Sequence, residues 1–268
     1  MKMPNVVVSG MMGRMGSMIA RDFVLTNHVR LVGAVVAQNE VERARAFLDQ
    51  LGARNIPVSY EVSQILKTAG KIDIYLDFSV WGAVEGNVPE VAKANIPCII
   101  GVSGFAEEDF EWLEKLSAEN GVPILLVPNF SLGILLLKHM CCIVRKYFPK
   151  VELIETHHDM KRDAPSGTSL DIATTLAKID PPAPPNPPID ELDMGSRGMS
   201  VRDVKIHSLR LPGVIADQQV VFASKGELLT LTHSTTSREA FLTGIYYAID
   251  HIHEVDGFQV GLDKIIRI

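Results

Sequence analysis

Cysteine, positive charge and long apolar runs are scarce in this chain of 268 residues, and each scarcity excludes a class of protein. Three cysteines, two of them adjacent (Cys98, Cys141 and Cys142), form no disulfide framework and favour a reducing compartment. The 26 basic residues are outnumbered by 32 acidic ones, so no overall positive field attracts nucleic acid. The most apolar stretch, Ile124–Leu137, is interrupted by polar residues and falls short of the ~20 that a membrane helix needs. We expect a soluble, cytoplasmic protein with no nucleic-acid or membrane partner.

The first half of the chain alternates short β-branched runs with amphipathic segments. The runs are almost continuously apolar, as strands buried on both faces of a parallel sheet are. They are Asn5–Ser9, Arg30–Val36, Ile72–Phe78, Pro97–Gly101 and Val122–Val127. The helical segments are Arg14–Leu25, Val41–Leu51, Val62–Thr68, Val84–Ala94 and Glu107–Asn120. This alternation predicts an α/β fold with an N-terminal Rossmann-type parallel sheet domain over residues 1–128.

The pattern changes after Asn129 and predicts a C-terminal α+β domain with a largely antiparallel sheet over residues 129–240. The proline-rich run Pro181–Pro188 is expected to be an extended surface connection. The predicted helices are Leu132–Tyr147, about Thr168 to Lys178, and Arg238–His253. The predicted strands are Val151–Thr156, Val201–Leu211, Val214–Ala223 and Glu227–His233. We expect the remaining segment, residues 241–268, to pack back on the N-terminal domain.

A glycine-rich motif, GMMGRMG at residues 10–16, directly follows the first predicted strand and opens the first predicted helix. Glycines allow a sharp turn and a close approach of the backbone to a pyrophosphate, which the amides of the helix N-terminus then face. The spacing is GxxGxxG rather than the common GxGxxG, and its position favours dinucleotide binding. The residues expected to contact the dinucleotide are Gly10, Met11, Met12, Gly13, Arg14 and Met15.

The residues after the second predicted strand do not select between NADH and NADPH. An acid that binds the ribose hydroxyls is expected there, but Val36 and Ala37 occupy the place and Glu40 comes later. The first basic residue that could bind a 2′-phosphate in this segment is Arg43. Either cofactor therefore remains open.

A second motif combines two histidines and a lysine with a helix start. His157, His158 and Lys161 precede the sequence Pro-Ser-Gly-Thr, which ends at Thr168. Neighbouring strand side chains point to opposite faces and no further metal-ligand spacing is present, so no metal site is expected. Imidazole exchanges protons near neutral pH, lysine supplies positive charge, and the amides of Gly167 and Thr168 can bind a carboxylate. This combination is suited to reduction of a small anionic substrate.

Several segments together resemble the dihydrodipicolinate reductase family of bacterial lysine and diaminopimelate biosynthesis, nearly end to end. They are Gly10–Gly16, Pro128–Ser131, Glu155–Thr168 (ETHHDMKRDAPSGT), Ile206–Gly213 (IHSLRLPG), Thr232–Glu239 (THSTTSRE) and the terminal GLDKII. The resemblance implies reduction of 4-hydroxy-tetrahydrodipicolinate to tetrahydrodipicolinate with NADH or NADPH bound in the N-terminal domain. It also implies a homotetramer built through the C-terminal sheets.

The resemblance also implies the roles of individual residues. His157 is the acid/base and Lys161 the catalytic lysine, while His158, Gly167 and Thr168 contact the substrate. Hydride added at ring C4 gives an enamine, which His157 protonates while Lys161 stabilises the developing negative charge. Further cofactor contacts are implied at Gly101, Val102, Ser103, Val127, Pro128, Asn129 and Phe130. Two departures from the family pattern are the loss of threonines at Val102 and Ser103 and the missing acid-plus-arginine pair after the second strand.

Two other functions explain part of the sequence. A different two-domain NAD(P)-dependent dehydrogenase, acting on an amino acid or a sugar, accounts for the glycine motif and the fold. A non-enzymatic NAD(P)H-binding regulator needs only the segment Gly10–Gly16. Neither explains why two histidines and a lysine precede Pro-Ser-Gly-Thr.

Overall fold

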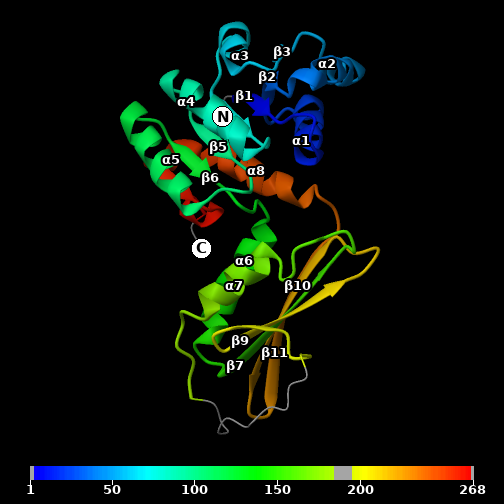
Figure 1. Ribbon diagram of the computed structural model, residues 1–268, viewed down its shortest axis with the longest axis vertical. Helices are drawn as coiled ribbons and strands as arrows, with labels where there is room; N and C mark the ends of the chain where they lie inside the picture. The colour runs from blue at the N-terminus through cyan, green and yellow to red at the C-terminus, as the bar shows by residue number, and fades with distance from the viewer. Residues whose placement is uncertain (1–2, 184–194, 267–268) are drawn as a thin grey trace. The chain divides into compact units, whose positions relative to one another are not determined.

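The structure, a computed structural model, describes residues 3–183 and 195–266 (Figure 1). Part of the proline run Pro181–Pro188, from residue 184 on, lies outside the described residues. The chain divides into two compact units, one of Met1–Phe130 with Phe241–Arg267 and one of Ser131–Ala240. In the described part of the chain, no helix combines the length and apolar character that crossing a membrane requires.

A seven-stranded sheet, in the order β12-β6-β5-β4-β1-β2-β3, forms the centre of the first unit. Every neighbouring pair is parallel, which confirms the predicted Rossmann-type sheet. The strands are β1 (Asn5–Ser9), β2 (Arg30–Val35), β3 (Val58–Ser59), β4 (Ile74–Asp77), β5 (Cys98–Ile100), β6 (Ile124–Leu126) and β12 (Phe258–Val260). The sequence pattern predicted five of them and missed β3 and β12, which are short and, unlike β5 and β6, do not lie within a longer apolar run. The order reverses at β1, which lies between β2 and β4, and ligands bind at such a switch point in open parallel sheets.

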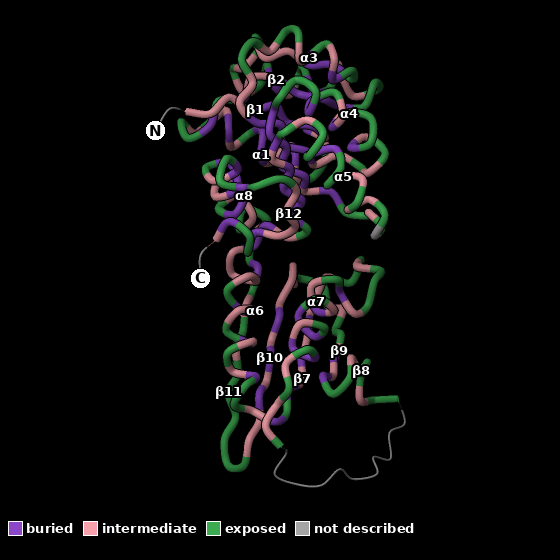
Figure 2. Tube along the Cα trace, turned by 90° about the vertical axis from the view of Figure 1, so that its left-hand side faces the viewer, coloured by how far each residue is buried: buried purple, intermediate pink, exposed green. Residues whose placement is uncertain are grey.

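The helices of the first unit bury apolar faces against this sheet, and most residues of its central strands are coloured as buried in Figure 2. Side chains of α3, α4 and α5 share one core with the sheet residues Val7, Tyr75 and Cys98. The helices α1 and α8 lie together, because the Tyr246 hydroxyl donates to the Asp22 carboxylate. The bounds are α1 (Arg14–Leu25), α2 (Val41–Gln50), α3 (Val62–Thr68), α4 (Trp81–Lys93), α5 (Glu107–Asn120) and α8 (Ala240–His251). The last strand, β12, pairs with β6, so residues from the end of the chain complete the N-terminal sheet.

The second unit is a five-stranded mixed sheet in the order β11-β10-β7-β9-β8. Only β7 and β9 pair in parallel, and the other neighbours are antiparallel, as the prediction of a largely antiparallel sheet requires. The strands are β7 (Lys150–His157), β8 (Met199–Val201), β9 (Val204–Arg210), β10 (Ala216–Ser224) and β11 (Glu227–Thr235). The predicted single strand Val201–Leu211 is wrong at its start, because Arg202 adopts a positive φ of 53° and turns the chain between β8 and β9. The buried Arg145 guanidinium pairs with Asp203 in that turn.

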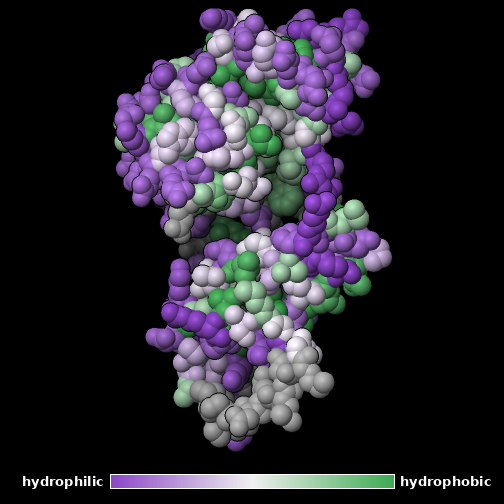
Figure 3. All heavy atoms as spheres, in the orientation of Figure 1, coloured by the Kyte–Doolittle hydropathy of each residue, from purple (hydrophilic) through white to green (hydrophobic). Residues whose placement is uncertain are grey.

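Two helices, α6 (Leu132–Arg145) and α7 (Gly167–Leu176), share the apolar core of the second unit with its sheet. Leu137 and Cys141 of α6 are buried in this core beside Leu153 and Val220 of the sheet. Another side of α6 remains exposed, and its exposed apolar side chains recur at helical spacing. They are Leu136, Met140 and Ile143. On the face seen in Figure 3, hydrophobic residues gather on this unit where α6 and α7 lie.

Candidate active site

The glycine motif forms a tight turn between β1 and α1 at the switch point of the sheet. Gly10 has a φ of +72°, and a Cβ there would lie 2.5 Å from the Phe78 carbonyl oxygen. A Cβ on Gly16 would lie 2.2 Å from the Gly10 carbonyl oxygen. Both positions therefore require glycine for the loop to lie this close to its neighbours. The sequence prediction of a strand–turn–helix motif agrees with this geometry.

The N-terminus of α1 has amides that can face an anion. Gly13 is the N-cap residue, and the first intrahelical bond runs from the Ser17 amide to the Gly13 carbonyl, over 3.0 Å. The amides of Arg14, Met15 and Gly16 precede that bond, and the first turn contains no acidic side chain. Helix dipoles and amides of this kind bind phosphate, so this turn fits the pyrophosphate of a dinucleotide. Met11 is fully buried, so only its backbone can contribute.

A second part of the same sheet edge is built from two aromatic rings. The centroids of the Phe78 and Phe130 rings lie 5.2 Å apart. A Cβ on Gly101 would lie 2.4 Å from Cε1 of Phe78 and 2.8 Å from Cε2 of Phe130. Gly101 follows β5 and Phe130 follows β6, so the carboxyl ends of these strands bring the predicted contacts of both segments to one edge. The remaining predicted contacts lie in the same two segments: Val102, Ser103, Val127, Pro128 and Asn129.

Exposure limits how these residues can contact a ligand. Val102 and Val127 are buried residues, with 4% and 1% of their surfaces exposed. Their side chains therefore lie in the core of the first unit. Valine at position 102 also lacks the hydroxyl group that the family resemblance implies there.

The segment after β2 contributes a basic side chain that the sequence pattern did not place. Nη2 of Arg43, in the first turn of α2, donates to the Met12 carbonyl oxygen over 3.3 Å. The same nitrogen lies 3.2 Å from Oε1 of Glu40. Arg43 therefore folds back against the glycine loop, on the side where a parallel sheet of this order holds the adenosine ribose. The sequence analysis named Arg43 as the first basic residue of this segment, but it did not predict the contact with the glycine loop.

In the second unit, the predicted acid/base His157 ends β7 and is bonded to a buried carboxylate. Nδ1 of His157 contacts Oε2 of Glu155, which lies two residues earlier and therefore on the same face of the strand. The Glu155 side chain is fully buried, whereas 12% of the His157 side chain is exposed. Arg210 of β9 pairs with both oxygens of Glu155, at 3.0 Å and 2.9 Å. Sequence reasoning missed Glu155 and Arg210, although both occur in the motifs Glu155–Thr168 and Ile206–Gly213.

Burial and charge set the protonation of this cluster. Burial lowers the pKa of His157, and the positive charges of Lys161 and Arg210 add to this effect, while the hydrogen bond to Glu155 opposes it. Burial would raise the pKa of Glu155, but hydrogen bonds from Arg210, Ser208 and His157 hold that pKa below its usual value. Glu155 is therefore an anion that can only accept, so neutral His157 carries its proton on Nδ1. Nε2 is left as the nitrogen that can exchange a proton with a substrate.

The predicted lysine lies in the loop that follows β7. The Lys161 amide donates to the His158 carbonyl over 3.1 Å, which turns the loop back on itself. Nζ of Lys161 lies 2.8 Å from each carboxylate oxygen of Asp163. This ion pair lowers the pKa of Asp163. Because the Asp163 side chain is 58% exposed, it can move aside when an anionic ligand binds to Lys161.

The predicted anion site is the N-terminus of α7. Ser166 is its N-cap, and the Ser166 Oγ accepts from the Ser169 amide over 3.2 Å. The buried Gln218 fixes this cap through a hydrogen bond with Ser169 Oγ. Gly167 and Thr168 are the first two residues of the helix, so their amides precede its first intrahelical hydrogen bond. The helix start thus presents amide donors in the same unit as His157 and Lys161.

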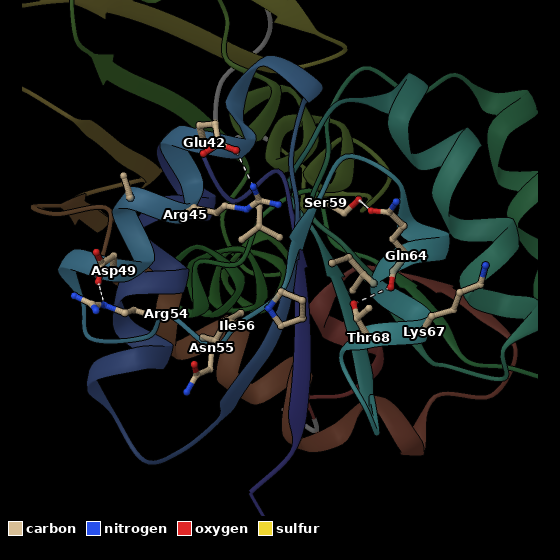
Figure 4. Close-up of a pocket in the computed structure, with 14 residues that line it drawn as sticks. Glu42, Arg45, Asp49, Arg54, Asn55, Ile56, Ser59, Gln64, Lys67 and Thr68 are labelled. Atoms are coloured by element: carbon tan, nitrogen blue, oxygen red, sulfur yellow. Dashed lines mark hydrogen bonds and ion pairs between the residues drawn. The ribbon is translucent and has the colours of Figure 1, made fainter.

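A hollow of about 910 Å³ lies elsewhere in the first unit, between α2, β3 and α3 (Figure 4). Its charged side chains are largely paired with each other, Arg45 with Glu42 at 2.7 Å and Arg54 with Asp49. None of the residues predicted to bind cofactor or substrate lines this hollow. Among the described residues, no group of three or more histidine, cysteine, aspartate or glutamate side chains is arranged to hold a metal ion.

Comparisons with known proteins agree with the resemblance in the sequence. Residues 4–130 match the N-terminal part of dihydrodipicolinate reductase, and residues 133–266 match its C-terminal part. The 4-hydroxy-tetrahydrodipicolinate reductase of Moorella thermoacetica is 36% identical over 263 residues, which cover 98% of this chain and 97% of that protein. The enzyme of the same name from Enterococcus faecalis is 35% identical over 265 residues, which cover 98% of this chain and 100% of that protein.

Solved structures show the same relationship. The dipicolinate-bound dihydrodipicolinate reductase from Paenisporosarcina sp. TG-14 is similar with a TM-score of 0.84 and 30% identity, covering 99% of this chain and 100% of that one. A probable dehydrogenase from Thermotoga maritima, at 12% identity and a TM-score of 0.66, shares the fold alone. The matches over both halves of the sequence, together with relatives above 30% identity along nearly its whole length, show that this chain belongs to the dihydrodipicolinate reductase family.

Proposed function

We propose that this chain reduces 4-hydroxy-tetrahydrodipicolinate to tetrahydrodipicolinate with NADH or NADPH, in the biosynthesis of lysine and diaminopimelate. The observation that carries the proposal is one cluster in the second unit. His157 and Lys161 lie on the strand end and loop that lead into the α7 N-terminus, in a chain whose relatives are named for this reaction. The alternative dehydrogenase and regulator functions account for the glycine loop, but they give this cluster no role.

The overall reaction consumes one hydride and one proton and releases water. The 4-hydroxy substrate loses its hydroxyl group as water, which leaves a conjugated imine. When bound, the nicotinamide supplies the hydride that forms the new bond at ring C4. The electron pair of the ring double bond then belongs to an enamine, whose neighbouring ring carbon must receive a proton. The chain has to supply that proton and to stabilise the negative charge before it arrives.

His157 is the proposed proton donor, acting through Nε2 because Nδ1 is bonded to Glu155. Its lowered pKa leaves it neutral in the unliganded protein near pH 7. A bound dicarboxylate adds negative charge close to the His157 imidazole and raises its pKa. Substrate binding would therefore protonate His157, which later donates this proton to the substrate. Lys161 is the proposed electrostatic partner, with Nζ released from Asp163 to stabilise the developing charge.

The proposed substrate site is an anion site at the start of α7. The amides of Gly167 and Thr168 bind one carboxylate, and His158 contacts the other end of the ring. A small dicarboxylate fits this arrangement, and the relative from Paenisporosarcina sp. TG-14 is described as dipicolinate-bound. The helix amides would orient the carboxylate that they bind, and this favours a single position of the substrate ring.

The proposed cofactor site is the switch point of the first unit. Gly10, Gly13 and the first amides of α1 hold the pyrophosphate, as their close packing and open N-terminus support. The half-buried Phe78 ring, packed on the buried Phe130 ring, offers an apolar surface at the same edge that is suited to a planar ring. Arg43 beside the glycine loop offers a positive charge to a 2′-phosphate, and Glu40 offers an acceptor to a ribose hydroxyl. We therefore propose that both NADH and NADPH can bind at this site.

We also propose a homotetramer that assembles through the second unit. Among the residues that the structure describes, the nine-residue strand β11 is an edge of the sheet and pairs only with β10. Leu228 on this strand is 71% exposed, and edge strands with exposed apolar side chains pair readily with other chains. The exposed apolar side of α6 belongs to the same unit. Light scattering coupled to size-exclusion chromatography tests the proposal, which predicts a mass of four chains and is contradicted by a monomer.

A steady-state assay tests the proposed reaction. The substrate is generated in the cuvette by a dihydrodipicolinate synthase, and oxidation of NADH or NADPH is followed by its absorbance. The proposal predicts turnover with this substrate and none with a panel of amino acids and sugars in the reverse direction. Turnover with the panel alone would favour the alternative dehydrogenase. Cofactor binding without turnover of any substrate would favour the regulator.

A further inference from the structure

Glu155 receives more hydrogen bonds than an ordinary buried carboxylate. Its Oε2 accepts from Nδ1 of His157 and, over 3.0 Å, from Nη1 of Arg210. Its Oε1 accepts from Nη2 of Arg210 over 2.9 Å and from the Ser166 amide over 3.3 Å. One side chain with no exposed surface thus joins the end of β7, strand β9 and the N-cap of α7.

The strand registers explain why these groups meet. Residues two apart on a strand share a face, which places Glu155 beside His157 on β7. The parallel pairing of β7 with β9 sets Arg210 opposite His157 and Ser208 opposite Glu155. Arg210 also donates to the Asp163 carbonyl over 2.6 Å, so it holds the loop that carries Lys161. The bidentate pair neutralises the buried carboxylate and at the same time fixes the loop.

We propose that Glu155 is a positioning residue for His157, held as an anion by Arg210, and that it fixes the imidazole tautomer so that Nε2 faces the substrate. This proposal rests on the proposed function, because it presupposes that His157 donates a proton to the substrate. A carboxylate accepts and never donates, so it selects the Nδ1–H form of neutral imidazole. When His157 takes up a proton, the adjacent carboxylate also stabilises the imidazolium.

A purely structural ion pair would be the simpler explanation, and it predicts different results. Removing one partner of a buried ion pair destabilises a protein whatever the function of the pair. Stability alone therefore cannot separate the two roles. The tautomer of His157 and the pH dependence of turnover can separate the two roles. If the pair of Glu155 with Arg210 were purely structural, its loss would leave both of these properties unchanged.

The chain contains a matched control on the same strand. Glu152 of β7 also bonds a histidine and an arginine, with Oε2 2.8 Å from Nε2 of His207 and a contact to Arg197. This cluster includes none of the residues proposed to bind substrate or cofactor. Glu152→Gln removes the same kind of charge as Glu155→Gln, but Glu152 lies three residues earlier and therefore on the opposite face of β7.

The experiment compares Glu155→Gln, Glu155→Asp and Glu152→Gln in the full-length protein labelled with 15N-histidine. We expect Glu155→Gln to lower kcat by roughly 10²-fold or more, as loss of a positioned acid/base does. Its amide can donate to Nδ1, so the 15N shifts of neutral His157 should change from the Nδ1–H to the Nε2–H form. Glu155→Asp keeps the charge and should keep the Nδ1–H form with a smaller loss of kcat. Glu152→Gln should match the wild type in kcat and in the His157 shifts.

A wild-type tautomer and pH profile in Glu155→Gln, with or without a loss of kcat, would overturn the proposal. If Glu155→Gln does not fold, Glu155→Asp carries the test, and an unchanged kcat there contradicts a role that depends on contact with Nδ1. The shifts are recorded without substrate, so they are independent of the proposed reaction. A changed tautomer in a protein that turns over no 4-hydroxy-tetrahydrodipicolinate would therefore refute the proposed function and leave the positioning role intact.

Discussion

The guanidinium of Arg43 donates a hydrogen bond to the backbone carbonyl of Met12, so a residue of α2 is fixed against the glycine loop. Neither Val36 nor Ala37 at the end of the second strand has a polar side chain that could bind the ribose, and Val36 is also buried. We therefore propose that the choice between NADH and NADPH depends on Arg43 and its partner Glu40, which lie 3.2 Å apart. Because Arg43 and Glu40 carry opposite charges beside the glycine loop, we expect only a moderate preference for one of the two cofactors.

We predict that the wild-type protein uses NADH and NADPH with kcat/KM values within about tenfold, which corresponds to about 1.4 kcal/mol. Arg43→Ala should weaken NADPH binding about tenfold and leave NADH binding nearly unchanged, as measured by calorimetry at low and high salt. Arg45→Ala is the control, since Arg45 pairs with Glu42 in the hollow between α2, β3 and α3, away from the glycine loop. A preference beyond a hundredfold in the wild type, or equal losses for both cofactors in Arg43→Ala, would contradict the role of Arg43.

His157→Gln and Lys161→Met should each lower kcat far more than they raise KM. Protonation and charge stabilisation act mainly in the transition state, and general acid catalysis is typically worth ~10²–10⁴-fold. Steady-state kinetics at saturating substrate measures the effect. His207→Gln, which removes the histidine paired with Glu152, should retain wild-type kinetics. Near-normal kcat in His157→Gln would show that another group supplies the proton.

Thr168→Val should weaken binding of pyridine-2,6-dicarboxylate, a planar mimic of the substrate that we expect to compete with it. In the proposed site the start of α7 binds a carboxylate through its amides and the Thr168 hydroxyl, so the predicted loss is about tenfold, the value of one hydrogen bond to a charged group. Affinity for NAD(P)H in the unliganded protein should stay nearly unchanged. Thr175→Val, at the other end of the helix, is the control. Equal losses for both ligands would mean that Thr168 supports the fold.

The pH dependence should show two different midpoints. His157, which faces Glu155, Lys161 and Arg210, has a pKa lowered from the ordinary value of about 6.5. Since kcat/KM reports the unliganded protein and the proton donor must be charged, kcat/KM should fall as pH rises, with a midpoint below 6.5. The bound dicarboxylate raises the pKa, so kcat should fall only at higher pH.

A proton should accordingly be taken up when pyridine-2,6-dicarboxylate binds near pH 7. Calorimetry in buffers of different ionisation enthalpy measures this uptake directly. We expect it to disappear in His157→Gln. Binding without proton uptake in the wild type would contradict the proposed loading of His157 by the ligand.

The sequence predicted much of the fold because its strands and helices carry clear periodicity. The ranges Asn5–Ser9, Arg14–Leu25 and Val62–Thr68 agree with the observed elements. The strands β3 and β12 could not be found in the same way, since their partners are distant in sequence and they are very short. The turn at Arg202 was not predicted, because the segment from Val201 to Leu211 mixes apolar and polar residues as a half-buried strand does, and it contains no glycine or proline to mark a turn.

The candidate site could be predicted only where residues lie together in the sequence. The segment from His157 to Thr168 is contiguous, so its motif placed the histidines, the lysine and the helix start at once. Arg210 joins Glu155 through the pairing of β7 with β9, and Gln218 reaches the α7 cap from β10. Such long-range partners follow from sheet register, which the periodicity of one strand does not determine.

The central claim, that this chain transfers a hydride to the ring of 4-hydroxy-tetrahydrodipicolinate, is tested most directly by isotope transfer. The reaction is run with cofactor deuterated at both C4 positions of the nicotinamide, and the product is examined by NMR. We predict one deuterium at ring C4 of tetrahydrodipicolinate and a proton from the solvent at the neighbouring carbon. A product without deuterium at C4, or no product despite cofactor binding, would contradict the claim.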